Sequence, residues 1–255
     1  MGYEIVVFLG PTMSVADARE HLDALYLTPA GNGDIVRAVI EHDPSAIALI
    51  DGVFGQSPAV RHKEILWAMS RGVRVYGASS MGAVRAAELT EYGMSGYGMV
   101  FRWYRRTLLA DDADVAVAMA PAQLGSFPLG DALIDIRLTL KRALRDRIIG
   151  RQLQVALERL ARSIHYTERS FGKLISIAAE RGISSRELRA LDLWLVSGKR
   201  KQKEADATGL LALLSSNALE MKKRSEPRSF ELTEAFAYDM EYYNFADILL
   251  DPDHH

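Results

Sequence analysis

The feature that most constrains the fold is an alternation, in the first half of the chain, between short apolar runs and segments with helical spacing. Apolar runs rich in β-branched residues occupy residues 4–9, 46–50 and 73–76, and a glycine or an Asp-Gly pair follows each of them. Strands separated by helices of about 10–15 residues predict right-handed βαβ units. We therefore expect an α/β fold with an open, mostly parallel doubly wound sheet, and we place a fourth strand at residues 115–119.

Helix signals lie between the apolar runs. The first predicted helix begins at a serine with capping-box spacing, and the third begins at Ser57-Pro58, an N-cap followed by a proline at the first helical position. A later helix follows residue 82 and ends at Gly93, which suits a C-terminal cap. The predicted helices before it span residues 14–25, 34–42 and 57–72, with a loop rich in Pro and Gly at 26–33.

From about residue 128 the pattern changes to helical segments rich in Arg and Lys. We expect a core domain at residues 1–125 and a helical appendage at residues 126–255. Its predicted helices span residues 131–162, 184–198 and 205–222, with an exposed loop at 199–203. Its basic residues form either a solvated helix face or a surface for an acidic protein or leader peptide: Arg137, Lys141, Arg142, Arg145, Arg147 and Arg151.

The chain contains no cysteine, which excludes disulfides, cysteine-ligated zinc, iron–sulfur clusters and a persulfide on the chain itself. The spacings HExxH, GxxxxGK(S/T) and GxGxxG are also absent. Metalloprotease, P-loop and dinucleotide-binding functions therefore lose their usual motif support, and we expect no cofactor and no metal. Three acids, Asp111, Asp112 and Asp114, either hold a hard cation or form a solvated turn.

Charge and hydropathy exclude two further kinds of partner. The formal net charge of -2 gives no general attraction to nucleic acid. No run of ~20 apolar residues is present, and the first residues indicate a strand rather than a signal peptide. We expect a cytoplasmic protein that binds neither nucleic acid nor a membrane.

The candidate site lies where the carboxyl ends of the predicted strands meet. Gly10 and Thr12 follow the first strand, Asp51 follows the second, and the small residues 78–82 follow the third. In open parallel sheets, ligands bind at this edge, close to helix N-termini. Polar and glycine residues at three matching places are harder to explain by packing than any one of them alone.

The segment from Ala78 to Gly82 has the sequence form of a nucleophile elbow, with a strand before it and a helix after it. In this interpretation Ser80, or its neighbour Ser79, is the nucleophile, and the amides of Met81 and Gly82 hold an oxyanion. Two alternatives stay open. In the first alternative, Ser79 only caps the helix while Ser80 occupies its first turn. In the second, the turn binds an anion without covalent chemistry.

A serine nucleophile requires a base at neutral pH. His62 is the best candidate, with Lys63 beside it as a second; adjacent helix positions point about 100° apart, which limits how many can face one cleft. An ordinary histidine at the surface or core edge is the alternative for His62. Asp51 orients the base, binds a substrate amine or only forms a turn. Arg85 either positions an anion or pairs with Glu88.

Several motifs occur in one order along the chain. They are Phe-Leu-Gly-Pro-Thr at 8–12, Pro-Ala and Gly-Asp-Ile within 29–35, Ile-Asp-Gly-x-Phe at 50–54, His-Lys-Glu-Ile-Leu at 62–66, Ala-Ser-Ser-Met-Gly-Ala-x-Arg-Ala-Ala-Glu-Leu at 78–89, and Asp-Asp at 111–112. This order resembles the core domain of the TfuA-like family over roughly residues 4–120, with a weaker similarity at 166–169.

The resemblance implies a role beside YcaO enzymes, which use ATP to install thioamides in peptide backbones. Members of the family are thought to supply sulfur, in one proposal by hydrolysing the C-terminal thiocarboxylate of a ThiS-like ubiquitin-fold sulfur carrier. The implied partners are a YcaO-family ATP-dependent cyclodehydratase-like enzyme, a ThiS-like carrier and a substrate peptide. The roles of Ser80 and His62 come from their spacing and not from the resemblance.

Three functions follow from these considerations. Without cysteine, the chain must pass sulfide as an ion, act on a thioacid or organise its partner. Thioacid hydrolysis is acyl transfer, so the first prediction is a serine-dependent thiocarboxylate hydrolase that delivers sulfur. The alternative is a non-enzymatic adaptor or allosteric activator of YcaO that binds the carrier or the peptide. A generic esterase or amidase is the third, although the sequence lacks an obvious later histidine in the usual hydrolase order, since His165 falls in the helical part.

Overall fold

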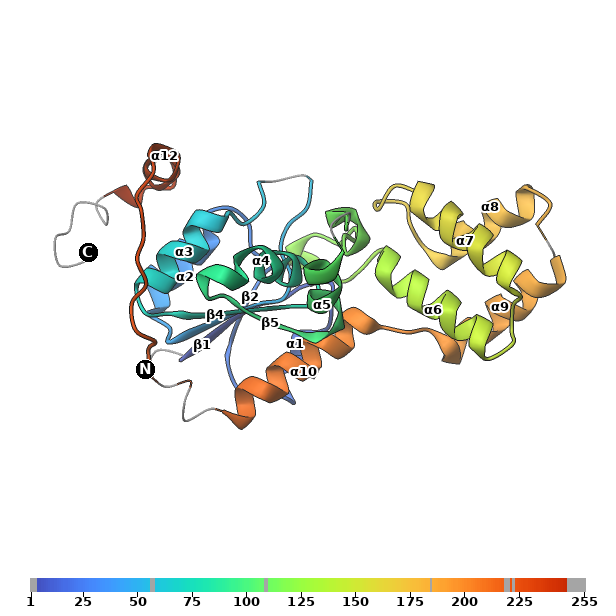
Figure 1. Cartoon of the computed structure of the whole chain (residues 1–255), viewed down its shortest axis with the longest axis horizontal. Helices are drawn as coiled ribbons and strands as arrows, with labels where there is room; N and C mark the ends of the chain where they lie inside the picture. Colours follow the sequence, from blue (N-terminus) through green and yellow to red (C-terminus); the bar gives the residue numbers. More distant parts are fainter. Residues whose placement is uncertain are drawn as a thin grey trace.

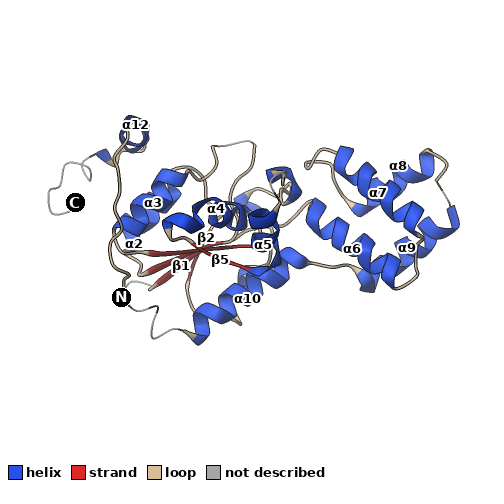
Figure 2. Cartoon of the chain, in the orientation of Figure 1, coloured by secondary structure: helices blue, strands red, loops and turns tan. Residues whose placement is uncertain are grey.

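The centre of the molecule is a five-stranded, all-parallel sheet, seen edge-on in the computed structural model (Figures 1 and 2). The structure describes residues 4–55, 58–107, 110–183, 185–217, 221 and 223–246. The strand order is β2-β1-β3-β4-β5, with bounds β1 Ile5–Phe8, β2 Leu25–Leu27, β3 Ala46–Leu49, β4 Arg74–Ala78 and β5 Ser95–Tyr97. The predicted α/β class, with a mostly parallel sheet and a C-terminal helical region, is confirmed.

Helices cover both faces of this sheet, as a doubly wound arrangement requires. Alternate side chains of β1 point to opposite sides, so that Val6 and Phe8 join one core cluster while Ile5 and Val7 join another. On the first face lie α2 (Asp34–His42), α3 (His62–Ser70) and α4 (Met81–Leu89). On the second lie α1 (Val15–Arg19) and α10 (Gln202–Ser216), which Figure 1 shows below the sheet. Helix α5 (Gly98–Arg106) packs against α4 and α10.

Two strands differ from the prediction. The edge strands β2 and β5 were not predicted, and each is only three residues long. Residues 25–27 were expected to be a helix end and the start of a loop, and no element was predicted at residues 95–97. The strand predicted at residues 115–119 is wrong: this segment makes one isolated bridge, between Met119 and Pro128. Its apolar character has another cause, because Val115 and Ala116 are buried and Val115 packs with side chains of α4 and α5.

The predicted helix boundaries agree with the structure for some helices and differ for others. α2 and the end of the α4 region agree with the prediction, and Gly93 adopts the left-handed conformation with φ 103°. α1 ends at Arg19, earlier than expected. α3 begins at His62 instead of Pro58, which lies outside the helix, and Ser57 lies outside the described residues.

Four helices of the second half form a bundle with its own apolar core (right in Figure 1): α6 (Leu133–Arg145), α7 (Arg151–Ser163), α8 (Phe171–Glu180) and α9 (Ser185–Gly198). After the bundle the chain returns to the sheet as α10, and α12 (Glu234–Tyr242) packs near α2 and α3 through Phe236 and Met240. The boundary at residue 125 stays a prediction. Within the described ranges, no helix is long and apolar enough to cross a membrane.

Two of the basic residues predicted to be exposed are buried. Arg137 donates to Asp114 at 2.7 Å and pairs with Glu158 at 3.2 Å, which compensates its burial. Lys203 was placed in an exposed loop, but it lies in the first turn of α10 and is 4% exposed. Helical spacing alone does not reveal such cations, because the elements that bury them come from elsewhere in the chain.

Helix α10 is fixed at the sheet by two carboxylates. Asp135 of α6 accepts hydrogen bonds from the amides of Gln202 and Lys203, at 2.8 and 3.3 Å, and so caps α10. Asp206 of α10 accepts one from the amide of Val100 at 2.7 Å, at the start of α5. These contacts hold the N-terminus of α10 in place, and with it the side chain of Lys203.

Candidate functional site

The site is built around Asp51, a fully buried carboxylate two residues after the end of β3. Its Oδ2 accepts hydrogen bonds from the amides of Gly10 and Thr12, at 2.9 and 3.1 Å, and its Oδ1 accepts one from the Thr12 hydroxyl at 2.7 Å. Three donors compensate for burying this charge. The residues predicted after the first and second strands are therefore brought together, with Asp51 joining the two loops.

A chain of hydroxyl groups extends from Asp51 to the serine turn. The oxygens of Thr12 and Ser79 lie 3.2 Å apart. Since the single hydroxyl proton of Thr12 is directed at Asp51, Ser79 is the donor to Thr12. Ser79 is fully buried and has φ 69°, an unusual value for a residue other than glycine. The backbone bend therefore lies at Ser79, and the hydroxyl of Ser79 helps to hold it.

Two glycines allow the turn to lie directly against the strands. A Cβ added at Gly82 would lie 1.7 Å from the carbonyl oxygen of Leu49, and one added at Gly77 would lie 2.0 Å from the carbonyl oxygen of Gly82. Only a residue without a side chain permits so close an approach. The first turn of α4 is thus packed backbone to backbone on β3 and β4.

Ser80 occupies the N-cap position of α4, and the amides of Ala83 and Val84 donate to its carbonyl oxygen. Its side chain makes no capping hydrogen bond. Among the described residues, none of the hydrogen bonds uses the Ser80 hydroxyl. The alternative in which Ser79 caps this helix is wrong, because Ser80 is the N-cap residue. The Ser80 hydroxyl is left for another partner.

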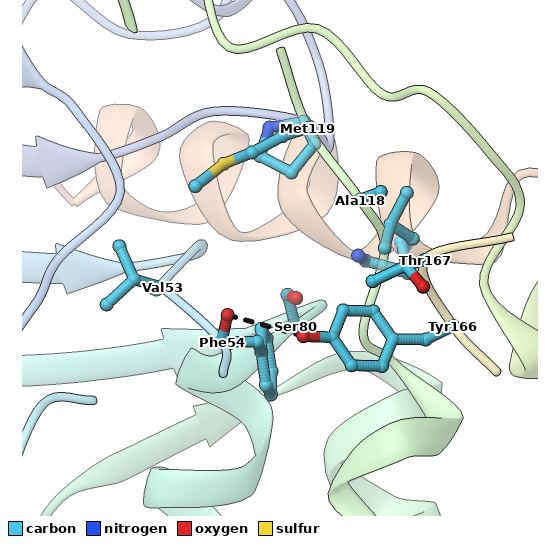
Figure 3. Close-up of a pocket in the computed structure, with 11 residues that line it drawn as sticks. Val53, Phe54, Ser80, Ala118, Met119, Tyr166 and Thr167 are labelled. Atoms are coloured by element: carbon cyan, nitrogen blue, oxygen red, sulfur yellow. Dashed lines mark hydrogen bonds between the residues drawn. The ribbon is translucent and has the colours of Figure 1, made fainter. Parts of the chain in front are cut away.

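Ser80 lines a cavity of about 140 Å³ at the carboxyl edge of the sheet (Figure 3). Because Ser80 is only 2% exposed, a ligand reaches its hydroxyl through this cavity. A cavity of about 150 Å³ is large enough for a benzene molecule, so the space suits the end group of a substrate. Its other walls are Pro11, Gly52, Val53, Phe54, Val117, Ala118, Met119, Tyr166, Thr167 and Lys203.

The helical region supplies one wall of the cavity. The Tyr166 hydroxyl donates to the carbonyl of Phe54 at 3.4 Å and lies beside Ser80 in Figure 3. A Cβ at Gly55 would lie 2.3 Å from that hydroxyl. The buried Arg169 holds this loop by donating to the carbonyls of Ala113, Ala161 and Ile164, at 2.8 to 3.1 Å.

Backbone amides next to Ser80 differ in their availability. The Gly82 amide donates to the carbonyl of Ile50 at 3.3 Å. In the described part of the chain, the Met81 amide has no backbone acceptor, as expected at the first position of a helix. Of the two amides predicted to hold an oxyanion, Met81 is therefore the one without a backbone acceptor among the described residues.

The three basic residues predicted for the site, His62, Lys63 and Arg85, have other partners. Nε2 of His62 lies 2.7 Å from Oε2 of Glu88, and Nζ of Lys63 donates to the carbonyl of Glu231 at 2.8 Å. Arg85 pairs with Glu88 at 2.7 Å and donates to the carbonyl of Val60, in agreement with the pairing alternative. Burial opposes ionisation of Glu88, but the hydrogen bonds from His62 and Arg85 outweigh it and lower its pKa.

The roles of His62 and Lys63 as bases stay predictions. Among the described residues, their hydrogen bonds do not reach either serine. Nor does the described structure contain a group of His, Asp and Glu that could hold a metal ion. Asp114, one of the acids considered for a cation, is engaged by Arg137 instead.

Sequence reasoning missed two parts of the cavity wall, the residues 117–119 and Lys203. Residues 117–119 are apolar and were therefore predicted to be part of a strand. Lys203 carried no signal, because the four residues before it, 199–202, are all basic or polar, as is typical of a surface loop. The similarity at 166–169 pointed to Tyr166 and Thr167, although not to their position over Ser80.

The fold and the turn define the class of protein: a parallel α/β protein with a buried serine turn and a small cavity at the carboxyl edge of its sheet. The model of the TfuA-like protein family matches residues 51–170. The match includes Asp51, the serine turn and Tyr166, whereas Thr12 and Lys203 lie outside it. It begins later and extends further than the resemblance seen in the motifs. No curated protein is similar enough to the chain to match it.

Proposed function

We propose that this chain delivers sulfur in YcaO-dependent thioamidation by hydrolysing the thiocarboxylate of a ThiS-like carrier. The match of residues 51–170 to the TfuA-like family supports the setting. One observation carries the chemistry: the Ser80 hydroxyl has no hydrogen bond within the described residues and lines a cavity of about 140 Å³. An end group fits such a cavity, whereas a folded carrier domain stays outside it.

In this proposal Ser80 attacks the thioacid carbon, and the amide of Met81 donates to the oxygen that becomes negative. The carbon–sulfur bond then breaks, sulfur leaves as hydrosulfide, and water hydrolyses the ester on Ser80. Overall, a thiocarboxylate and water give a carboxylate, hydrosulfide and a proton. The hydrogen bonds from Ser79 through Thr12 to Asp51 keep the turn in position.

The test is sulfide release from a thiocarboxylated carrier by the purified chain. Ser80→Ala is expected to lower the rate at least about 100-fold while the thermal unfolding temperature stays within a few degrees. Ser79→Ala, the matched neighbour, is expected to have a smaller effect because that hydroxyl is buried and engaged. Release that is undiminished in Ser80→Ala would remove the serine mechanism.

A second function is favoured by the positions of His62 and Lys63, which hydrogen-bond away from the serine turn. If no base serves Ser80, the chain is an adaptor or allosteric activator of YcaO that binds the carrier or the substrate peptide. Full stimulation of YcaO by Ser80→Ala, with no thioacid cleavage by the unaltered chain, would establish this function. His62→Gln and Lys63→Met complete the comparison, since loss of release in one of them alone would identify it as the base.

A further inference from the structure

Lys203 is a buried lysine without a carboxylate partner among the described residues. It is 4% exposed, and its Nζ donates one hydrogen bond, to the carbonyl of Val115 at 2.9 Å. Its neighbour Lys201 instead pairs with Glu204 at the surface, at 2.8 Å. Buried lysines are rarely left unpaired, and a perturbed lysine in a cavity is a candidate functional group.

Lys203 and Ser80 line the same small cavity, although they are separated by more than a hundred residues in sequence. Ser80 comes from the start of α4 on one face of the sheet, and Lys203 comes from the start of α10 on the other. Each has hydrogen-bonding capacity that the described protein does not use. The capping of α10 by Asp135 fixes the backbone from which the lysine extends.

The surroundings of Lys203 lower its pKa below the ordinary lysine value. Burial lowers its pKa, and the negative charges of Asp51 and Asp135 only partly oppose this effect. A lysine with a lowered pKa has a larger neutral fraction at a given pH, and its nitrogen can then accept a proton. None of the other titratable side chains considered for this role lines the cavity.

We propose that Lys203 is the general base for Ser80. This assignment rests on the proposed acyl chemistry for its natural substrate. Nζ takes the hydroxyl proton as the Ser80 oxygen bonds to the thioacid carbon, and it returns that proton to the departing sulfur. In the second half, Nζ takes a proton from the attacking water and gives it to the Ser80 oxygen as the ester breaks.

A fluorophosphonate probe tests this assignment without the carrier. The serine oxygen forms a bond to phosphorus, fluoride leaves, and the base takes the hydroxyl proton. We expect the full-length chain to be labelled at Ser80 and Ser80→Ala to be unlabelled. Lys203→Met is expected to lower the labelling rate at least about 100-fold, the usual contribution of a general base. Lys201→Met, on the same helix end, is the control and should be labelled like the unaltered chain.

Comparing Lys203→Arg with Lys203→Met distinguishes a general base from a fixed positive charge. Arginine stays protonated, so a base role predicts that Lys203→Arg is as slow as Lys203→Met. A rate in Lys203→Arg close to that of the unaltered chain would overturn the proposal in favour of a charge that only attracts the probe. Thermal unfolding of each variant shows whether it is folded.

The pH dependence of the unaltered chain gives a test that needs no variant. Labelling should rise with pH through one ionisation below the ordinary lysine pKa and then level off, and a flat profile would overturn the proposal. If the chain does not hydrolyse the thiocarboxylate of the carrier, the two experiments give a different combination of results. Labelling at Ser80 that depends on Lys203, together with no sulfide release from the carrier, would remove the thioacid substrate and leave the Lys203 assignment standing.

Discussion

The two ends of α4 place residues of the same motif in opposite environments. At the N-terminal end, Ser80 is buried against backbone and its hydroxyl has no hydrogen bond within the described residues. Toward the C-terminal end, Glu88 pairs with Arg85 and with His62 of α3, and the side chains of Glu88 and His62 are 41% and 47% exposed. Groups that satisfy each other have little capacity left for a ligand. The comparison therefore locates the candidate chemistry at the buried end and a surface cluster at the other.

The substitution expected to destabilise the N-terminal end of α4 most is Gly82→Ala. The added Cβ would meet the carbonyl oxygen of Leu49 at 1.7 Å, so that helix and strand must separate. We expect a loss of about 3 kcal/mol in the free energy of unfolding, measured with urea. Gly172→Ala in α8 is the control, because its Cβ would meet nothing closer than the Ser170 hydroxyl at 4.0 Å. Equal effects of the two substitutions would contradict the packing described for the turn.

Asp51→Asn should have a smaller effect on stability and also reduce sulfide release. The amide nitrogen of asparagine cannot accept, so at least one of the donors from Gly10 and Thr12 loses its acceptor while buried. A loss of about 1–3 kcal/mol is expected from urea unfolding. Asp146→Asn, in a surface ion pair with Arg142, serves as the control and should change stability by less than about 0.5 kcal/mol. An Asp51→Asn protein as stable as this control would argue against a structural role for the Asp51 contacts.

Glu88→Gln tests the surface end and should have the smallest effect. Because the folded pKa of Glu88 lies below its ordinary value, its ionised form adds stability at neutral pH. That contribution is lost as pH falls through the folded pKa, and solvent screening keeps it below about 1 kcal/mol. Urea unfolding of both proteins at several pH values should show a difference at pH 7 that disappears in acid. A difference that grows in acid would have the wrong sign.

The sequence predicted the central strands well because their signal is local. β1 and β3 are buried on both faces, so each appears as a short continuous apolar run. β4 alternates between half-buried and buried positions at its start, and the β-branched Val73 and Val75, just before and within it, carry the signal. The edge strands are only three residues long: β2 is the half-buried tripeptide Leu-Tyr-Leu, and β5 is the tripeptide Ser-Gly-Tyr. Their pairing depends on neighbouring strands that a short window of sequence does not contain.

The candidate site was predictable to the extent that it follows strand ends. Gly10, Thr12, Asp51 and Ser79 meet as expected, because the carboxyl ends of parallel strands share one edge. Lys203 was not predictable in this way. Its burial depends on the return of α10 to the sheet after four intervening helices, and its sequence neighbours are typical of an exposed loop.

The position of α10 has a consequence for how the molecule is made. The helix contributes Ala207, Leu210 and Leu211 to the cluster that covers Ile5 and Val7. On a ribosome, the part of this face that α10 covers stays exposed until that helix has emerged, so a nascent chain is expected to need chaperone shielding there. A recombinant fragment that ends before α10 would carry the same uncovered face permanently and is expected to aggregate.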